Sequence, residues 1–198
     1  MKTASLQKFH FLAVMVTLLV LTQADIRAAT VILPRPIPLQ AESIAHLRQA
    51  HANESNNWQL VVFGFSHCKD VCPISMANLA MLVKAAADEQ IPINGTFVTV
   101  DPDRDSAATL SQYTQNFSSK IAYLRFEGEE LERFKKTFGV EVIFYTKNEG
   151  NLSNYQVDHS TSAFLIDREG RIRVMFDALK DASDIVRMFR EKKDLFKV

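Results

Sequence analysis

The sequence predicts an α/β domain, and three observations support this prediction. Residues 59–65 form a run that is apolar on both alternating faces, as in a strand buried between two layers. After this run, segments with helical spacing of apolar residues alternate with short segments typical of strands. The length of 198 residues, 47% of them hydrophobic, suffices for one core. Such alternation favours parallel strands that are connected through helices.

The first 24 residues have the pattern of a secretory signal. Two lysines precede a run over residues 11–21 that is apolar except for Thr17, and Thr22-Gln23-Ala24 supplies small residues at the two positions that a signal peptidase reads. The run is well short of the ~20 residues that cross a bilayer as a helix. Cleavage near Asp25 is therefore favoured, and without cleavage residues 9–21 would attach the protein to the membrane.

An N-terminal extension, residues 25–57, separates this segment from the expected domain at 58–198. Three prolines within residues 34–38 favour an extended or polyproline backbone, so this part is interpreted as a tether into the domain. Residues 40–52 place apolar side chains at helical spacing and predict a short amphipathic helix.

The remaining elements continue the alternation. Pro73 suits the first turn of a helix and predicts one over residues 73–88. Further along, the pattern predicts a strand over 96–100, a helix over 106–117, a strand over 121–126 and a helix over 129–138. Two hairpins are expected next, from strands 142–145 and 154–157 around a polar loop at 147–151, and from strands 163–167 and 172–176. An amphipathic helix that contains Ile185, Met188 and Phe189 closes the chain.

The charge of the chain argues against nucleic-acid binding. Lys+Arg and Asp+Glu both number 23, which gives a formal net charge of +0. No overall electrostatic field therefore exists that would attract nucleic acid or an acidic membrane surface.

Both cysteines stand where the buried strand is expected to pass into a helix. Amides and dipoles at a helix N-terminus favour negative charge, so Cys72 is expected to have a lowered thiol pKa, as is Cys68 if the turn brings it near. Lys69 adds a cation beside the thiols. The four-residue offset allows the two sulfurs to meet across one turn. They can then share a metal or form a reversible disulfide.

A structural disulfide is the simplest alternative for two cysteines in an exported domain. It is disfavoured because a disulfide that closes so small a loop constrains the unfolded chain little, and because Pro73 places the pair at a helix start. Metal binding or redox chemistry is favoured instead. His67, next to Cys68, is either a tuning residue, a spare ligand or a solvated loop residue.

Four motifs, in matching order and spacing, carry a resemblance to a known family. They are Gly64-Phe65-Ser66-His67-Cys68 through Cys72-Pro73, Val100-Asp101-Pro102-Asp103-Arg104-Asp105, Phe138-Gly139-Val140, and Val157-Asp158-His159-Ser160 before Phe164-Leu165-Ile166-Asp167. Together they resemble the Sco/SenC family of copper-binding proteins, and the resemblance covers about residues 58–177.

The resemblance implies a thioredoxin-like central sheet that is flanked by helices and carries a hairpin insertion. It also implies one copper ion, Cu(I) or Cu(II), bound by Cys68, Cys72 and His159, and a role in building the CuA centre of cytochrome c oxidase. Thiolates suit Cu(I), and an added imidazole also suits Cu(II). The implied partners are the copper-bearing oxidase subunit or another periplasmic copper or thiol protein.

Aspartates accompany these candidate ligands. Residues 101–105 follow a strand end and start a helix, where carboxylates cap backbone amides, so a structural turn is the preferred interpretation. Asp158 is a candidate to orient the imidazole of His159, although neighbouring side chains on a strand point to opposite faces.

Three functions remain open from the sequence. The first is a periplasmic copper chaperone with no turnover of its own. The second is a periplasmic thiol-disulfide oxidoreductase with Cys68 and Cys72 as its redox pair. The third is a sensor of copper or redox state that uses the same pair. His159 separates the first from the second, because ligation needs the imidazole and disulfide exchange does not.

Overall fold

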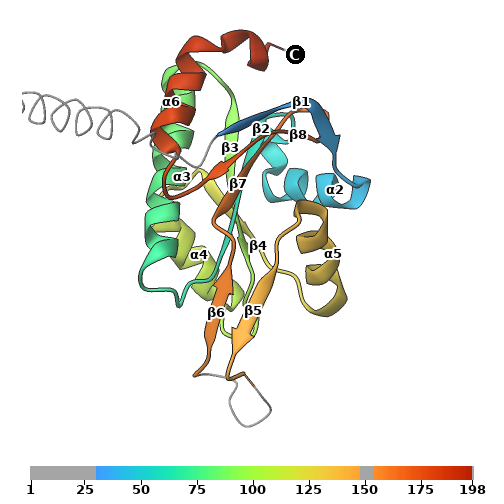
Figure 1. Cartoon of the computed structure of the whole chain (residues 1–198), viewed down its shortest axis with the longest axis vertical. Helices are drawn as coiled ribbons and strands as arrows, with labels where there is room; N and C mark the ends of the chain where they lie inside the picture. The colour runs from blue at the N-terminus through green and yellow to red at the C-terminus, as the bar shows by residue number, and fades with distance from the viewer. Residues whose placement is uncertain (1–29, 148–153, 198) are drawn as a thin grey trace, which may run out of the picture.

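The computed structural model describes residues 30–147 and 154–197 (Figure 1). The expected signal segment 1–24 lies outside the described residues, as does most of the expected loop at 147–151.

A six-stranded sheet forms the centre of the molecule, with the strand order β1-β8-β7-β2-β3-β4. Its strands are β1 (Val31–Pro38), β2 (Trp58–Gly64), β3 (Ile93–Thr99), β4 (Ile121–Leu124), β7 (Ser162–Ile166) and β8 (Arg171–Asp177). The expected parallel pairing is confirmed for β2, β3 and β4. β7 pairs antiparallel with β2 and also with β8, to which a tight turn connects it.

Helices cover both faces of this sheet (Figure 1). They are α2 (Ala41–Ala50), α3 (Val71–Asp88), α4 (Ala107–Gln115), α5 (Gly128–Phe138) and α6 (Ala182–Glu191), with 3-10 turns at Ala52–Glu54 and Lys193–Phe196. On β2, Leu60 and Val62 pack with α3, α4 and α6, whereas Val61 and Phe63 pack with α2 and α5. All seven residues of β2 are buried, as expected for a strand between two layers.

The longest helix, α3, begins at Val71, two residues before the start that Pro73 suggested. Among the described residues it is the one helix that is long and apolar enough to cross a membrane by length and composition. Its buried side chains, which include Met76 and Leu79, pack in the core of the domain. Its apolar character therefore has an explanation within the fold.

The interpretation of residues 34–38 as a tether is wrong. They belong to β1, an edge strand that pairs antiparallel with β8. Pairing holds at Val31, Ile32, Ile37 and Pro38, and the register shifts between Ile32 and Ile37, where two of the prolines lie. Proline cannot donate to a ladder but is tolerated at an edge strand or a bulge, so the segment is extended and paired at once.

The expected hairpin insertion is present as a separate two-stranded sheet, β5 (Val142–Tyr145) and β6 (Gln156–His159). It extends beyond one end of the central sheet (Figure 1). β6 begins two residues later than the expected strand at 154–157, so His159 is its last residue and pairs with Val142.

Candidate metal centre

The candidate ligands come from two segments that lie at the same end of the molecule. The loop between β2 and α3, residues 65–70, carries Cys68 and leads directly to Cys72 in the first turn of α3. The β5–β6 hairpin carries His159 to this end of the sheet (Figure 1).

Cys68 takes the place of a capping side chain at the start of α3. The N-cap residue Asp70 makes no side-chain capping bond, and the amide of Cys72 donates to Cys68 Sγ over 3.4 Å. Burial alone would raise the pKa of the Cys68 thiol, but hydrogen bonds from the amides of residues 70–72 outweigh it and lower this pKa. The expectation of a lowered thiol pKa holds for this cysteine.

The same expectation is wrong for Cys72. Burial raises the pKa of its thiol to about 12, since only 2% of the residue is exposed and the nearby Cys68 opposes a second negative charge. The helix amides stabilise the sulfur of Cys68 instead. Gly64 makes room for the buried sulfur, because a Cβ at that position would lie 3.2 Å from Cys72 Sγ and 2.8 Å from the ring of Phe97.

His159 faces Cys72 with one ring nitrogen. Its Nε2 lies 3.8 Å from Cys72 Sγ, and its Nδ1 lies 2.8 Å from the carbonyl oxygen of Ser160. The Nδ1–H therefore donates to this carbonyl, which leaves the lone pair of Nε2 on the side of the thiol. Burial lowers the pKa of the imidazole and so favours its neutral form. The backbone of Ser160, rather than the carboxylate of Asp158, fixes the ring.

These distances bear on whether one ion can meet all three side chains. Sulfur and nitrogen ligands about 2.3 and 2.0 Å from a tetrahedral metal are about 3.5 Å apart. Cys72 and His159, at 3.8 Å, are close to that separation. The three ligand atoms of Cys68, Cys72 and His159 do not all lie within 4.8 Å of one another. The structure thus places Cys72 between the two other ligands: its thiol contacts both His159 and the thiol of Cys68, and Cys68 also accepts hydrogen bonds from the helix amides.

The buried carboxylate of Asp105 holds the cysteine loop in place. It accepts hydrogen bonds from the amide of Ser66 at 3.1 Å, from the hydroxyl of Ser66 at 2.5 Å and from the hydroxyl of Thr99 at 2.6 Å. Ser106, rather than a carboxylate of residues 101–105, is the N-cap of α4. The expected turn is present, because the amides of Arg104 and Asp105 donate to the carbonyl of Asp101. His67 Nδ1 lies 3.3 Å from Asp105, so this ring faces the carboxylate rather than the thiols.

A second buried aspartate holds the hairpin. Asp101 accepts a hydrogen bond of 2.5 Å from the hydroxyl of Tyr155, directly before β6, and another of 2.5 Å from Nε of Arg104. The guanidinium of Arg104 also donates to the carbonyl of Tyr155 at 3.0 Å and stacks 3.8 Å from the centre of its ring. Residues 101–105, which we name the brace loop, therefore contact both ligand-bearing segments.

Comparison with known proteins agrees with this arrangement. The model of the SCO1/SenC family matches residues 47–193. The chain belongs to the SCO1/SenC family. An SCO2-like protein of Rickettsia prowazekii is 32% identical over 135 residues, which cover 67% of this chain and 64% of that protein. The mitochondrial SCO2 homologs of cattle and mouse are matched over 55% and 54% of their lengths, so the chain spans about half to two thirds of these relatives.

Solved Sco structures confirm the thioredoxin-like fold. Apo Sco1 from Thermus thermophilus superposes with a TM-score of 0.64 at 25% identity, over 84% of this chain and 95% of that one. Yeast Sco1 with copper bound gives a TM-score of 0.58 at 25% identity, over 81% of this chain and 90% of that one. The central sheet and its flanking helices are thus those of the Sco proteins.

Proposed function

We propose that this protein is an exported copper chaperone that binds one copper ion through Cys68, Cys72 and His159 and assists the metallation of the CuA centre of cytochrome c oxidase. The observation that carries the proposal is the 3.8 Å approach of His159 Nε2 to Cys72 Sγ, across 87 residues of sequence. Yeast Sco1, a member of the same family, has been solved with copper bound.

The protonation states of the two thiols support the binding of a soft cation such as Cu(I). Thiolates rather than thiols bind metals, and the amides at the start of α3 already favour ionised Cys68. Cys72 keeps its proton, with its pKa raised to about 12, until a cation arrives to offset the charge. Copper binding should therefore release a proton from Cys72. Two thiolates suit Cu(I), and the neutral imidazole makes the set acceptable to Cu(II).

Paired titrations with Cu(I) and Cu(II) test the ligand set. They compare the wild type with His159→Ala, Cys68→Ser and Cys72→Ser, and they use His67→Ala as a matched control because His67 faces Asp105. His159→Ala should weaken Cu(II) binding more than Cu(I) binding, since two thiolates alone still suit Cu(I). Either serine variant should weaken both. Unchanged Cu(II) binding and oxidase assembly in His159→Ala would contradict the three-ligand proposal.

Thiol-disulfide exchange is the second candidate, because the two cysteines differ in access. Cys68 is partly exposed, whereas Cys72 is buried beside it. In a reducing cycle, Cys68 thiolate attacks a target disulfide and expels one target thiolate. Cys72, giving up its proton, then displaces the second target thiolate and leaves the Cys68–Cys72 disulfide, which a dithiol reductase restores. His159→Ala should retain this activity, whereas Cys68→Ser should lose it.

The compartment and the partner complete the proposal. The signal pattern in residues 1–24 supports export to the periplasm, with membrane attachment through residues 9–21 if the segment is retained. There the copper-bearing subunit of cytochrome c oxidase, or another periplasmic copper or thiol protein, would receive the ion. Mass spectrometry of the protein from the periplasm should find a mature chain that begins near Asp25. A chain with Met1 intact that requires detergent would show attachment instead.

A further inference from the structure

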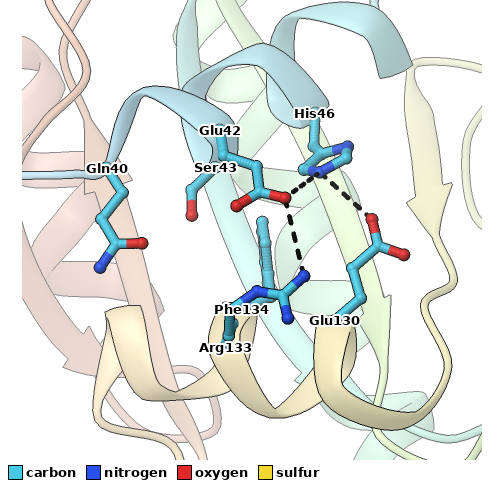
Figure 2. A pocket seen from close by; sticks show the side chains of 7 residues that line it. All are labelled: Gln40, Glu42, Ser43, His46, Glu130, Arg133 and Phe134. Carbon is cyan, nitrogen blue, oxygen red and sulfur yellow. Dashed lines mark ion pairs between the residues drawn. The ribbon is translucent and has the colours of Figure 1, made fainter.

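A second group of metal-ligating side chains lies on the other helical layer, between α2 and α5 (Figure 2). Glu42 and His46 are one turn apart on α2, and Glu130 faces them from the first turn of α5. His46 Nε2 lies 3.3 Å from Glu130 Oε1 and 4.0 Å from Glu42 Oε1. Among the described residues, this is the group of three whose ligand atoms all lie within 4.8 Å of one another.

The imidazole of His46 is held in this orientation by aromatic contacts. Its ring packs edge-on against Phe126, with 4.8 Å between the centroids, and against Phe134 at 6.4 Å. His46 Nε2 is shielded from solvent and has no hydrogen-bond partner. A buried nitrogen without a hydrogen bond is costly unless a proton or a metal occupies its lone pair. A proton or a metal ion on this nitrogen would be stabilised by the nearby carboxylates of Glu42 and Glu130.

The spacing favours a metal. Nitrogen and oxygen ligands about 2.0–2.2 Å from a tetrahedral ion are about 3.4 Å apart, which His46 and Glu130 already match. Glu42 lies slightly further, and its side chain is 55% exposed, so its carboxylate can rotate toward the ion. The hydroxyl of Ser43 and the amide of Gln40 line the same pocket and leave room for water as a further ligand (Figure 2).

The charges also favour a cation. Two carboxylates and a neutral imidazole carry two negative charges, and the guanidinium of Arg133, 3.9 Å from Glu42 Oε1, offsets one of them. Arg133 also lies 3.7 Å from Glu129, which gives it a second partner if a metal takes Glu42. Arg133 therefore lowers the affinity of the site for a cation but does not occupy the position of the ion.

We propose that Glu42, His46 and Glu130 form a second metal site, distinct from the cysteine centre, that takes a divalent cation of the Zn²⁺ class. A set of one imidazole and two carboxylates suits Zn²⁺ or Cu²⁺ and is a poor host for Cu(I), which prefers sulfur. The bound ion would join α2 to α5. It would thereby fix α2, which precedes the first central strand β2, to α5, which follows β4.

Zinc titration in a background without thiols tests the site. The background is the full chain with Cys68→Ser and Cys72→Ser, so that Zn²⁺ cannot bind to the cysteines, and calorimetry measures the stoichiometry. One Zn²⁺ per chain is expected. Both His46→Gln and Glu130→Gln should lose it, whereas Glu132→Gln, an exposed glutamate on the same helix that pairs with Lys135, should retain it.

Arg133→Gln separates loss of a ligand from loss of folding, because it frees Glu42 from its ion pair. A pair of unit charges about 4 Å apart is worth about 1 kcal/mol in water, so Zn²⁺ binding should tighten by about fivefold. Substituted Co²⁺ should show visible absorption bands in the background protein and none in His46→Gln. No Zn²⁺ binding, or equal binding by Glu130→Gln and Glu132→Gln, would overturn the proposal and leave His46 as an ion-pair partner only.

Discussion

The two ligand-bearing segments are held in place by different means. The cysteine loop lies between two elements of the core: every residue of β2 is buried, and α3 packs against the sheet. The β5–β6 hairpin makes no strand pairing with the central sheet, and side-chain contacts to the brace loop hold it. Backbone pairing and core packing thus place the cysteines, whereas side-chain contacts alone place the histidine. These are the hydrogen bonds to the brace loop, the packing of Val142 and Val157 against the core, and the edge contact of the His159 ring with Phe65.

The largest effect on this comparison is expected from Asp105→Ala. The change leaves the amide of Ser66 and the hydroxyl of Thr99 buried without their acceptor, which should lower the free energy of unfolding by about 2–4 kcal/mol. Urea denaturation measures it. Asp103→Ala in the same loop removes only an exposed pair with Lys147 and should stay within about 0.5 kcal/mol of wild type. Equal losses in both variants would contradict the role of Asp105.

A smaller and more local effect is expected from Tyr155→Phe. Losing the hydrogen bond to the buried carboxylate of Asp101 should cost about 1.5–3 kcal/mol of stability and loosen the hairpin. Cu(II) binding, which depends on His159, should weaken more than Cu(I) binding, and amide exchange in β6 should accelerate. Tyr145→Phe is the matched control, because Tyr145 lies on the same hairpin and is 46% exposed. A Cu(II) affinity that does not change in Tyr155→Phe would show that the hairpin is held by other contacts.

The smallest effect concerns the two thiols at alkaline pH. The folded protein lowers the pKa of Cys68 and raises that of Cys72 to about 12. Cys68 should therefore be alkylated first as the pH rises, and Cys72 should stay unmodified while the protein is folded. The fold raises the pKa of Cys72 from 9.0 to about 12, so the folded protein holds this proton more tightly than the unfolded chain does. The resulting contribution to the free energy of unfolding is complete below pH 9.0 and is lost as the pH rises toward 12. Mass mapping of alkylated peptides between pH 6 and about 10 checks the order.

Most elements of the fold follow from local patterns in the sequence. β2, α5 and the β7–β8 hairpin lie within a few residues of their predicted positions because periodicity and turn residues specify them locally. β1 was missed for a different reason. Three prolines resemble a tether, and only the partner strand β8, far along the chain, shows that they are paired.

The candidate site was predictable in its ligand residues and not in its electrostatics. Motif resemblance indicated Cys68, Cys72 and His159, and the structure brings the last two together. The raised pKa of Cys72 depends on the burial of its side chain in the core beside β2, and no local sequence pattern reveals this burial. Asp105 and Tyr155 were missed for a similar reason, since their partners lie 39 and 54 residues away in the sequence. The available signal was a cluster of aspartates, Asp101, Asp103 and Asp105, directly after a predicted strand.

The proline-rich edge strand has a consequence for self-association. An exposed sheet edge can recruit a strand from another copy of the chain and so begin aggregation. β1 covers β8, and its prolines offer no amide hydrogen to a further strand. At the opposite edge, β4 is only four residues long. Both ends of the sheet are thus poor templates, which disfavours edge-to-edge association between copies of the chain.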